Sequence, residues 1–233
     1  MRRLVFIAAV LGISGVLGAP ASASPIFDQP TLWAGNGTNV GISWTSQTSS
    51  GTGFVAFDTF SFAANTTINQ VNWYGIYLTG ADLTNGAPNT TRWDTLIFDT
   101  AAGHPNALVG GVIANTTVQR TALGTGLFGN NTVTVYQFSA VFPDLVAAAG
   151  ATYWFAPVSV SNIGFDPLFS WIQGTGGDNT SFQAHITNFV NDATFVRDGD
   201  RAFSLANVPE PSTIGLLAFG LGGVVAARRR QRS

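Results

Sequence analysis

The stretch FVAFDTFSF, from Phe54 to Phe62, is the most informative part of the sequence for the fold. Side chains of an extended backbone alternate between two faces, so every second residue from Phe54 lies on one face and Phe57 lies on the other. The first face therefore carries three phenylalanines, an alanine and Asp58. This pattern is typical of a strand that enters the core of a β-sandwich.

Seven further stretches share a composition rich in β-branched and aromatic residues, and we predict each to be a strand: Gln70–Leu78, Trp93–Asp99, Thr132–Phe142, Thr152–Val160, Leu168–Gln173, Ser181–Ile186 and Ala202–Leu205. Turn signals lie between several of them, at Asn85-Gly86, Gly129-Asn130, Gly174–Gly177 and Asp198-Gly199. Regularly spaced short strands with such turns predict an all-β fold, with a single antiparallel β-sandwich or jelly roll over residues 24–207.

Two segments of this body do not have the pattern of a strand. Asp144–Ala149 (DLVAAA) is a helical candidate of no more than one turn, because Gly150 follows it. Thr45–Gly53 (TSQTSSGTG) is expected to be a low-complexity loop.

The charge of the body excludes some classes of partner. It holds four arginines and eleven aspartates, and no lysine, which gives a formal net charge of −7. Nucleic-acid-binding proteins need clustered basic residues, so we exclude nucleic acid as a partner. The chain has no cysteine, and therefore no disulfide, thiolate nucleophile or lipoprotein attachment site.

The N-terminus has the three parts of a secretory signal peptide, residues 1–23. Arg2 and Arg3 form a positive region, Leu4–Leu17 an apolar region, and Ala21-Ser22-Ala23 a small-residue site for signal peptidase between Ala23 and the mature protein. We therefore expect an exported protein that begins at Ser24.

The C-terminus, residues 208–233, also has three parts. Val208-Pro209-Glu210-Pro211-Ser212 is expected to be extended, because each proline fixes its own φ and restricts the preceding residue. An uncharged apolar run, residues 213–227, is expected to form a transmembrane helix. The basic tail, residues 228–233, should stay in the cytoplasm; its arginines are Arg228, Arg229, Arg230 and Arg232.

This order of Pro-Glu-Pro, short apolar helix and arginine-rich end resembles the PEP-CTERM protein-sorting signal. The resemblance implies recognition by the membrane enzyme exosortase in a Gram-negative bacterium that makes extracellular polysaccharide. It implies cleavage near Pro209-Glu210-Pro211 of a precursor anchored in the inner membrane, and delivery of the upstream body to the cell surface or extracellular matrix.

The body shows a second, more diffuse resemblance. Six short segments occur in the order found in a common ectodomain of PEP-CTERM proteins: Phe57–Phe62, Ile68–Tyr77, Leu96–Phe98, Tyr136–Phe138, Gly150–Phe155 and Asp200–Leu205. That ectodomain is loosely similar to carbohydrate-binding jelly rolls. The resemblance implies a fold rather than an activity.

The sequence offers few groups suited to catalysis. His104, in a Gly-His-Pro turn, and His185, in a predicted strand, do not have the spacing of zinc ligands, and no Gly-x-Ser-x-Gly elbow is present. A glycosidase needs two carboxyl groups about 5–10 Å apart, but Asp94 and Asp99 face opposite sides of a regular strand. We therefore predict no catalytic residue and no enzyme activity.

Three aspartates are candidate metal ligands. First and last strands pair in jelly rolls, which can bring Asp58 close to Asp200, and the Asp198-Gly199-Asp200 turn adds a third carboxylate. Carboxylates together with backbone carbonyls can bind calcium. The simpler interpretation is a charged turn and a strand-edge aspartate that accept backbone hydrogen bonds. Calcium is the one cofactor that the sequence suggests.

Six tryptophans bear on glycan binding, and we expect at most two of them to be exposed, since most tryptophans of a sandwich lie in its core. The overall hypothesis is an exported, non-enzymatic surface or matrix protein that exosortase processes and that associates with exopolysaccharide. The alternatives are a carbohydrate-binding module, which exposed aromatic side chains along a groove would favour, and a glycan-active hydrolase, which paired aspartates in a pocket would favour.

Overall fold

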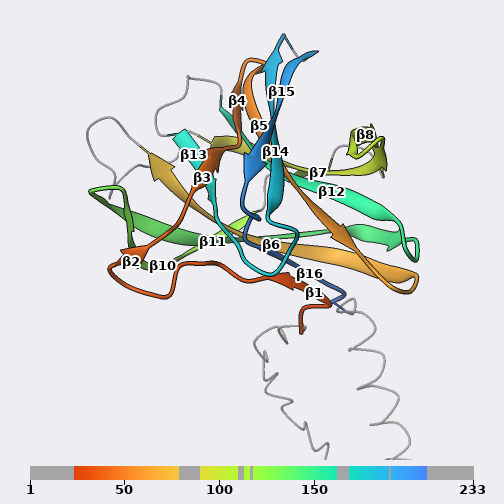
Figure 1. Ribbon diagram of the computed structural model, residues 1–233, viewed down its shortest axis with the longest axis horizontal. Coiled ribbons are helices and arrows are strands. Elements are labelled where there is room, and N and C mark those ends of the chain that lie inside the picture. The colour runs from red at the N-terminus through yellow and green to blue at the C-terminus, as the bar shows by residue number, and fades with distance from the viewer. Residues whose placement is uncertain are drawn as a thin grey trace, which may run out of the picture.

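The structure is a computed structural model, and it describes residues 24–78, 90–109, 113–115, 118–161, 168–188 and 190–208. Within these ranges the chain is all-β, with two curled sheets of eight strands each and no helix (Figure 1). The prediction of an all-β body is therefore confirmed. The predicted signal peptide and C-terminal helix lie outside the described residues.

The first sheet is built around a long central strand, β6. Its strands follow the order β1 (Phe27–Gln29), β16 (Phe203–Ala206), β6 (Thr66–Leu78), β11 (Asn131–Ala147), β10 (Gln119–Phe128) and β2 (Thr38–Asn39). Off this path, β13 (Leu168–Ile172) pairs with both β6 and β3 (Ser43–Thr45).

The second sheet holds the strand that the aromatic alternation predicts. Its order is β15 (Val190–Asp198), β14 (Thr180–Thr187), β5 (Thr52–Ser61), β4 (Gln47–Ser49), β12 (Thr152–Ser161), β7 (Thr90–Ala101) and β8 (His104–Leu108), and β9 (Ile113–Asn115) pairs with β7. The pairings are antiparallel apart from β10–β2 and β12–β4.

An aromatic core lies between the two sheets. Trp73 of β6 stacks on Phe138 of β11, and its ring also meets Trp93 of β7 edge-on at 5.2 Å, so the core crosses from one sheet to the other. Ala56 and Phe60 of β5 face this core, as predicted. Phe57 instead packs with Trp154 in a second apolar cluster on the other face of the second sheet.

Two local predictions are wrong. Residues 144–147 form no helix: they are the last part of β11, and Leu145, Val146 and Ala147 pair with the start of β6. Pairing with a neighbouring strand outweighs a helix propensity that is worth only tenths of a kcal/mol per residue. The predicted loop at 45–53 contains β4, which turns into β5 through Ser50 and Gly51, both at positive φ.

Both ends of the body lie at one end of the first sheet. The short first strand β1 pairs antiparallel with the last strand β16, with Phe27 opposite Leu205, and the N–H of Ile26 donates to the carbonyl of Leu205 at 2.8 Å. The chain therefore enters the body beside the point where it leaves (Figure 1). Among the described residues, no helix has the length and apolar character needed to cross a membrane.

Candidate functional site: the C-terminal junction

The end of the body is more ordered than the sequence predicts. The last strand that the sequence predicts ends at Leu205. Ala206 instead pairs with Gln70 of β6 and is buried, and Asn207 is the first exposed residue. Val208 is half-buried, so the body retains contact with the chain up to the residue before Pro209.

The side chain of Asn69 holds Val208 by both backbone groups. The N–H of Val208 donates to Asn69 Oδ1 at 2.7 Å, and Asn69 Nδ2 donates to the carbonyl of Val208 at 2.9 Å. The amide thus replaces the backbone partner that a continuing strand ladder would supply. We call this pair of hydrogen bonds the Asn69 clamp.

An irregularity in β11 fixes the orientation of the clamp. The β6–β11 register shifts between Val141 and Leu145, and this places Asp144 beside Asn69. Asn69 Nδ2 donates to Asp144 Oδ1 at 3.0 Å. A carboxylate only accepts hydrogen bonds, so it selects the amide orientation that also presents Oδ1 to the N–H of Val208.

Of the predicted processing motif, only Val208 belongs to the described residues. Its other members are Pro209, Glu210, Pro211 and Ser212, and they lie outside those residues, as do the signal cleavage residues Ala21 and Ala23 and the basic residues Arg228, Arg229, Arg230 and Arg232. Asn69 was missed by sequence analysis, because an asparagine within a strand carries no signal for a contact with a residue 139 positions away.

The predicted metal ligands come together only in part. Carboxylate oxygens of Asp58, Asp178 and Asp200 lie within 4.8 Å of one another. Asp58 and Asp200 are buried, and Asp178 is exposed. Asp198, at the exposed end of β15, is not a member of this cluster; its carbonyl accepts a hydrogen bond from Arg201.

Backbone N–H groups already contact both buried carboxylates. Asp58 accepts from Thr59 and Arg201, and Asp200 accepts from Gly177 at 2.8 Å and Asn179 at 2.6 Å. A Cβ at Gly177 would lie 2.6 Å from Asp200 Oδ1, so glycine is needed for this approach. Burial raises the pKa of Asp58 well above its usual value, although the two N–H donors lower it.

Arg201 supplies the positive charge beside these carboxylates. Its side chain is fully buried, and its two terminal nitrogens donate to four backbone carbonyls, those of Ile42, Trp171, Asp198 and Gly199. Burial lowers the pKa of Arg201 to about 10, and the nearby carboxylates of Asp58 and Asp200 act in the opposite direction. The arrangement therefore has the character of a structural network that ties several segments together.

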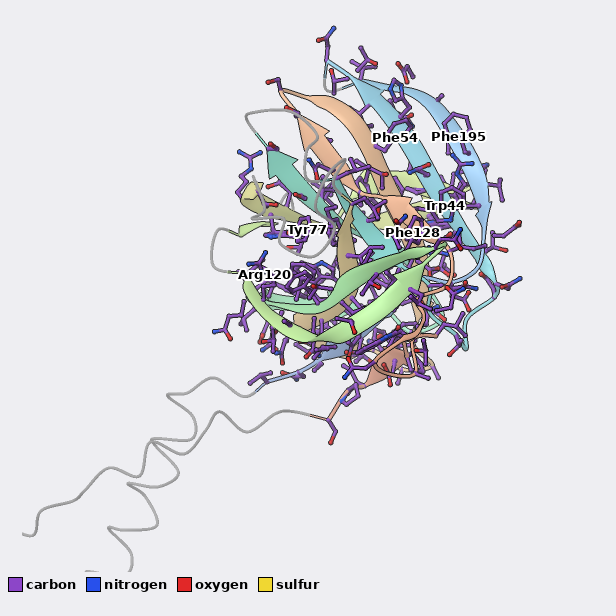
Figure 2. All side chains as sticks on the ribbon, turned by 90° about the vertical axis from the view of Figure 1, so that its left-hand side faces the viewer. Trp44, Phe54, Tyr77, Arg120, Phe128 and Phe195 are labelled. Carbon is purple, nitrogen blue, oxygen red and sulfur yellow. The ribbon has the colours of Figure 1, made fainter. Side chains whose placement is uncertain are left out.

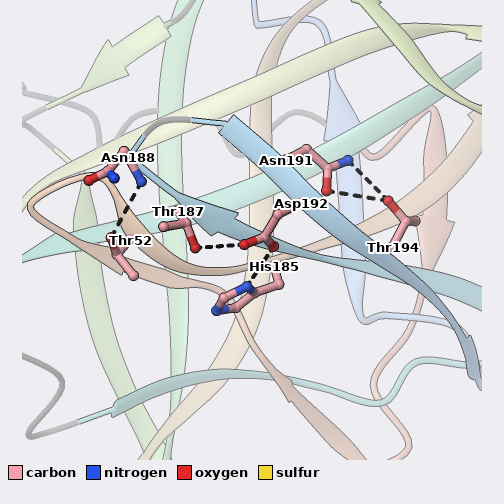
Figure 3. Close-up of polar contacts among 7 residues, drawn as sticks. All are labelled: Thr52, His185, Thr187, Asn188, Asn191, Asp192 and Thr194. Carbon is pink, nitrogen blue, oxygen red and sulfur yellow. Dashed lines mark hydrogen bonds and ion pairs between the residues drawn. The ribbon is translucent and has the colours of Figure 1, made fainter.

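The two histidines lie at the surface or close to it. His185 Nδ1 lies 2.6 Å from Asp192 Oδ1, and the hydroxyl of Thr187 donates to the other carboxylate oxygen, Oδ2, at 2.7 Å (Figure 3). The hydroxyl therefore contacts the aspartate rather than the imidazole, which is not the order of a Ser-His-Asp relay. His104 starts β8, and its ring meets Phe182 edge-on at 5.0 Å.

A small hollow lies on the outer face of the second sheet. It measures about 300 Å³, and it is lined by Phe57, His104, Pro105, Ala184, Asn191 and Thr194. Its floor is apolar, and its rim carries an imidazole, an amide and a hydroxyl. No carboxylate or guanidinium lines it, so it is suited to a neutral ligand.

The tryptophans follow the prediction that few are exposed. Trp73, Trp93, Trp154 and Trp171 are buried, and Trp33 and Trp44 are half-buried. The guanidinium of Arg197 lies 4.2 Å from the ring centre of Trp44 and 4.8 Å from that of Phe195. Both aromatic residues are labelled in Figure 2.

Comparison with known proteins identifies the segment that follows β16. Residues 207–231 match the family model of the PEP-CTERM protein-sorting motif, and the match begins inside the clamped junction. No curated protein and no solved structure matches the chain. The motif implies export and a membrane-anchored precursor that exosortase processes. This chain thus carries a PEP-CTERM sorting signal, which supports exosortase-dependent sorting of a surface protein.

Proposed function

We propose that this is a non-enzymatic surface or matrix protein of a Gram-negative bacterium, whose β-sandwich associates with exopolysaccharide after exosortase has removed the C-terminal anchor. The observation that carries the proposal is the position of the sorting motif. It begins at Asn207, one residue after the last strand ends at Ala206. Processing at the motif therefore leaves every strand of the body intact.

The position of the two ends of the body supports a membrane-anchored precursor. Because β1 and β16 are antiparallel neighbours, the segments before Phe27 and after Ala206 start from the same end of the first sheet. Basic residues at both chain termini favour the cytoplasmic side. An exported body between two such termini can face the membrane with one end and present the rest of its surface outward.

The chemistry of the described residues supports a non-enzymatic role. The buried carboxylates of Asp58 and Asp200 are engaged by backbone N–H groups, and the hydroxyl of Thr187 contacts Asp192 instead of His185. Asp94 and Asp99, the pair considered for a hydrolase, lie on opposite faces of β7, since Asp94 is opposite Val158 and Asp99 opposite Tyr153 in a continuous register.

The hollow beside β8 favours a second candidate function, a carbohydrate-binding module of jelly-roll type. An apolar floor with a few polar groups at its rim suits a sugar ring, which has apolar faces and hydroxyls at its edge. This candidate function and the surface role are compatible, because a surface protein can be retained by binding the polymer around the cell.

Deletion of Ile214–Ser233 tests the proposed sorting. Without the apolar run and basic tail, we expect the body to be released to the periplasm or medium without processing at the motif. Fractionation and the mass of the mature protein are the measurements. A control deletion of Gln231–Ser233 keeps the apolar run and three consecutive arginines, and should be processed. Equal location and mature mass for the long deletion and the full chain would refute the proposal.

A further inference from the structure

We propose that Asn69 is a positioning residue for exosortase processing: its clamp on Val208 fixes where the sorting motif leaves the folded body. The proposal rests on the processing function above. It deepens that function, because it assigns a role in processing to a residue of the body that lies outside the matched motif.

Asn69 contacts the backbone of Val208 and not its side chain. Asn69 uses one oxygen and one nitrogen for the N–H and C=O of Val208, at 2.7 Å and 2.9 Å, and uses its second N–H for Asp144 at 3.0 Å. The amide group therefore uses both of its donor hydrogens. Asn69 itself is only 6% exposed, so its side chain has little freedom to choose another partner.

The clamp exists only in the folded body. It needs Asn69 from β6, Asp144 from the irregular part of β11, and the chain that leaves β16. These three segments are far apart in the sequence and meet through strand pairing. A precursor whose body has not folded cannot hold Val208 in this way.

The clamp also sets a direction for the peptide. The residue that follows Val208 is Pro209, which fixes its own φ and restricts the conformation of the residue before it. The clamp therefore fixes the residue directly before Pro209. An enzyme that binds this peptide then has a smaller ordering cost, because part of the chain is already fixed.

The test follows processing of the full-length precursor in a host that contains exosortase. Asn69→Leu removes both hydrogen bonds to Val208 and keeps an apolar side chain of similar size. We expect the rate of precursor conversion in a pulse–chase experiment to fall at least about fivefold, the factor that corresponds to one net hydrogen bond, because the variant loses two. Asn72→Ala is the matched control, since this asparagine on the same strand contacts Ser204 rather than the motif, and it should be processed at the normal rate.

Two further variants separate positioning from stability. Asp144→Ala changes an exposed residue and removes the group that orients the amide, so it should slow processing without unfolding the body. Insertion of two glycines between Val208 and Pro209 keeps the clamp residues and the body but separates the clamped residue from the motif by two flexible positions. A positioning role predicts that the insertion slows processing as Asn69→Leu does, whereas a purely structural role of Asn69 predicts normal processing of the insertion variant.

A triple alanine variant of Pro209, Glu210 and Pro211 distinguishes failure of this inference from failure of the proposed function. Normal maturation of the triple variant would refute processing at the motif. Loss of maturation in the triple variant, together with wild-type rates for Asn69→Leu, Asp144→Ala and the insertion, would refute the clamp alone. Slow conversion of Asn69→Leu, Asp144→Ala and the insertion variant, with normal conversion of Asn72→Ala, supports it.

Discussion

Asp58 of β5 accepts a hydrogen bond from the backbone N–H of Arg201, a residue 143 positions later in the sequence, and this contact joins the two sheets. The buried Gln29 adds to it: with its amide nitrogen directed inward, it donates to Asp58 Oδ2 at 3.0 Å and to the carbonyl of Arg201 at 2.8 Å. Three segments therefore meet in one buried polar cluster: β1 through Gln29, β5 through Asp58, and the residues directly before β16 through Arg201.

The guanidinium of Arg201 is predicted to be essential for stability. Arg201→Lys keeps a positive charge. The two terminal nitrogens of the planar guanidinium contact four carbonyls, and a single ammonium group cannot reach all four. We expect the free energy of unfolding to fall by about 2 kcal/mol or more. Chemical denaturation of the purified body is the measurement.

Arg92→Lys is the control for that experiment. Arg92 is an exposed arginine that pairs with Asp94 two residues away, and exposed pairs contribute only about 0–1 kcal/mol. Similar losses of stability for both substitutions would show that the buried guanidinium of Arg201 has no special role.

The pH dependence of the free energy of unfolding should report the protonation state of the Asp58 carboxyl. Burial raises the pKa of this carboxyl above the value of about 3.8 that it has in the unfolded chain. The folded state therefore keeps the proton at pH values where the unfolded state has lost it. The stability that this provides is complete below pH 3.8 and is lost as the pH rises through the higher pKa of the folded state.

We therefore expect the melting temperature of the wild-type body to decrease more steeply from pH 4 upward than that of Asp58→Asn, which cannot ionise. Thermal unfolding followed by circular dichroism at half-unit steps from pH 4 gives both slopes. Parallel curves for the two proteins would contradict a raised pKa at Asp58.

The sequence predicts strands that bury their side chains, such as β5 and β12, and misses strands that are mostly exposed. The strand β5 has aromatic residues on alternate positions, and its two faces meet two different apolar clusters. By contrast, β15 is exposed or half-buried along its whole length, and β10 is exposed at most of its positions. Such strands are held by backbone pairing, which leaves no periodic pattern in the side chains.

The candidate sites show the same limit. That Asp58 approaches Asp200 could be predicted from an expected sandwich, but the third carboxylate is Asp178, from the turn before β14, and not Asp198. The choice depends on the N–H groups of Gly177 and Asn179, which bind Asp200 and hold that turn against it. A local pattern cannot reveal a contact that is made by tertiary pairing.

Calcium binding by the carboxylates remains a prediction. Each carboxylate oxygen of Asp200 accepts one N–H group and keeps a further lone pair for a cation. Binding to the folded state alone would raise the melting temperature by mass action, by about 2–4 °C for each kcal/mol in a body of this size.

Thermal unfolding in millimolar calcium and in chelator is the measurement, with Asp178→Asn and Asp198→Asn as a matched pair. The cluster geometry predicts that Asp178→Asn removes the effect of calcium and that Asp198→Asn retains it. An unchanged melting temperature of the wild type in calcium would exclude the site.

The hollow between β8 and the β14–β15 hairpin provides the test of glycan binding. Thr194 lies opposite Ala184 and carries a hydroxyl at its rim, where it accepts a hydrogen bond from Asn191 Nδ2 at 3.0 Å (Figure 3). Thr194→Val keeps the shape of this side chain and removes its hydrogen-bonding group. If a neutral sugar binds over the apolar floor formed by Phe57 and Ala184, loss of that group should raise the Kd about fivefold.

A glycan array with the purified body identifies the ligand, and calorimetry then compares the variants. Thr52→Val, at the β4–β5 turn and outside the hollow, is the matched threonine control and should bind like the wild type. His104→Ala should weaken binding as Thr194→Val does, because both residues line the hollow from opposite sides, one from β8 and one from β15. Glycan binding that neither substitution alters would place the sugar elsewhere on the body, since a ligand in a hollow of about 300 Å³ must contact its rim.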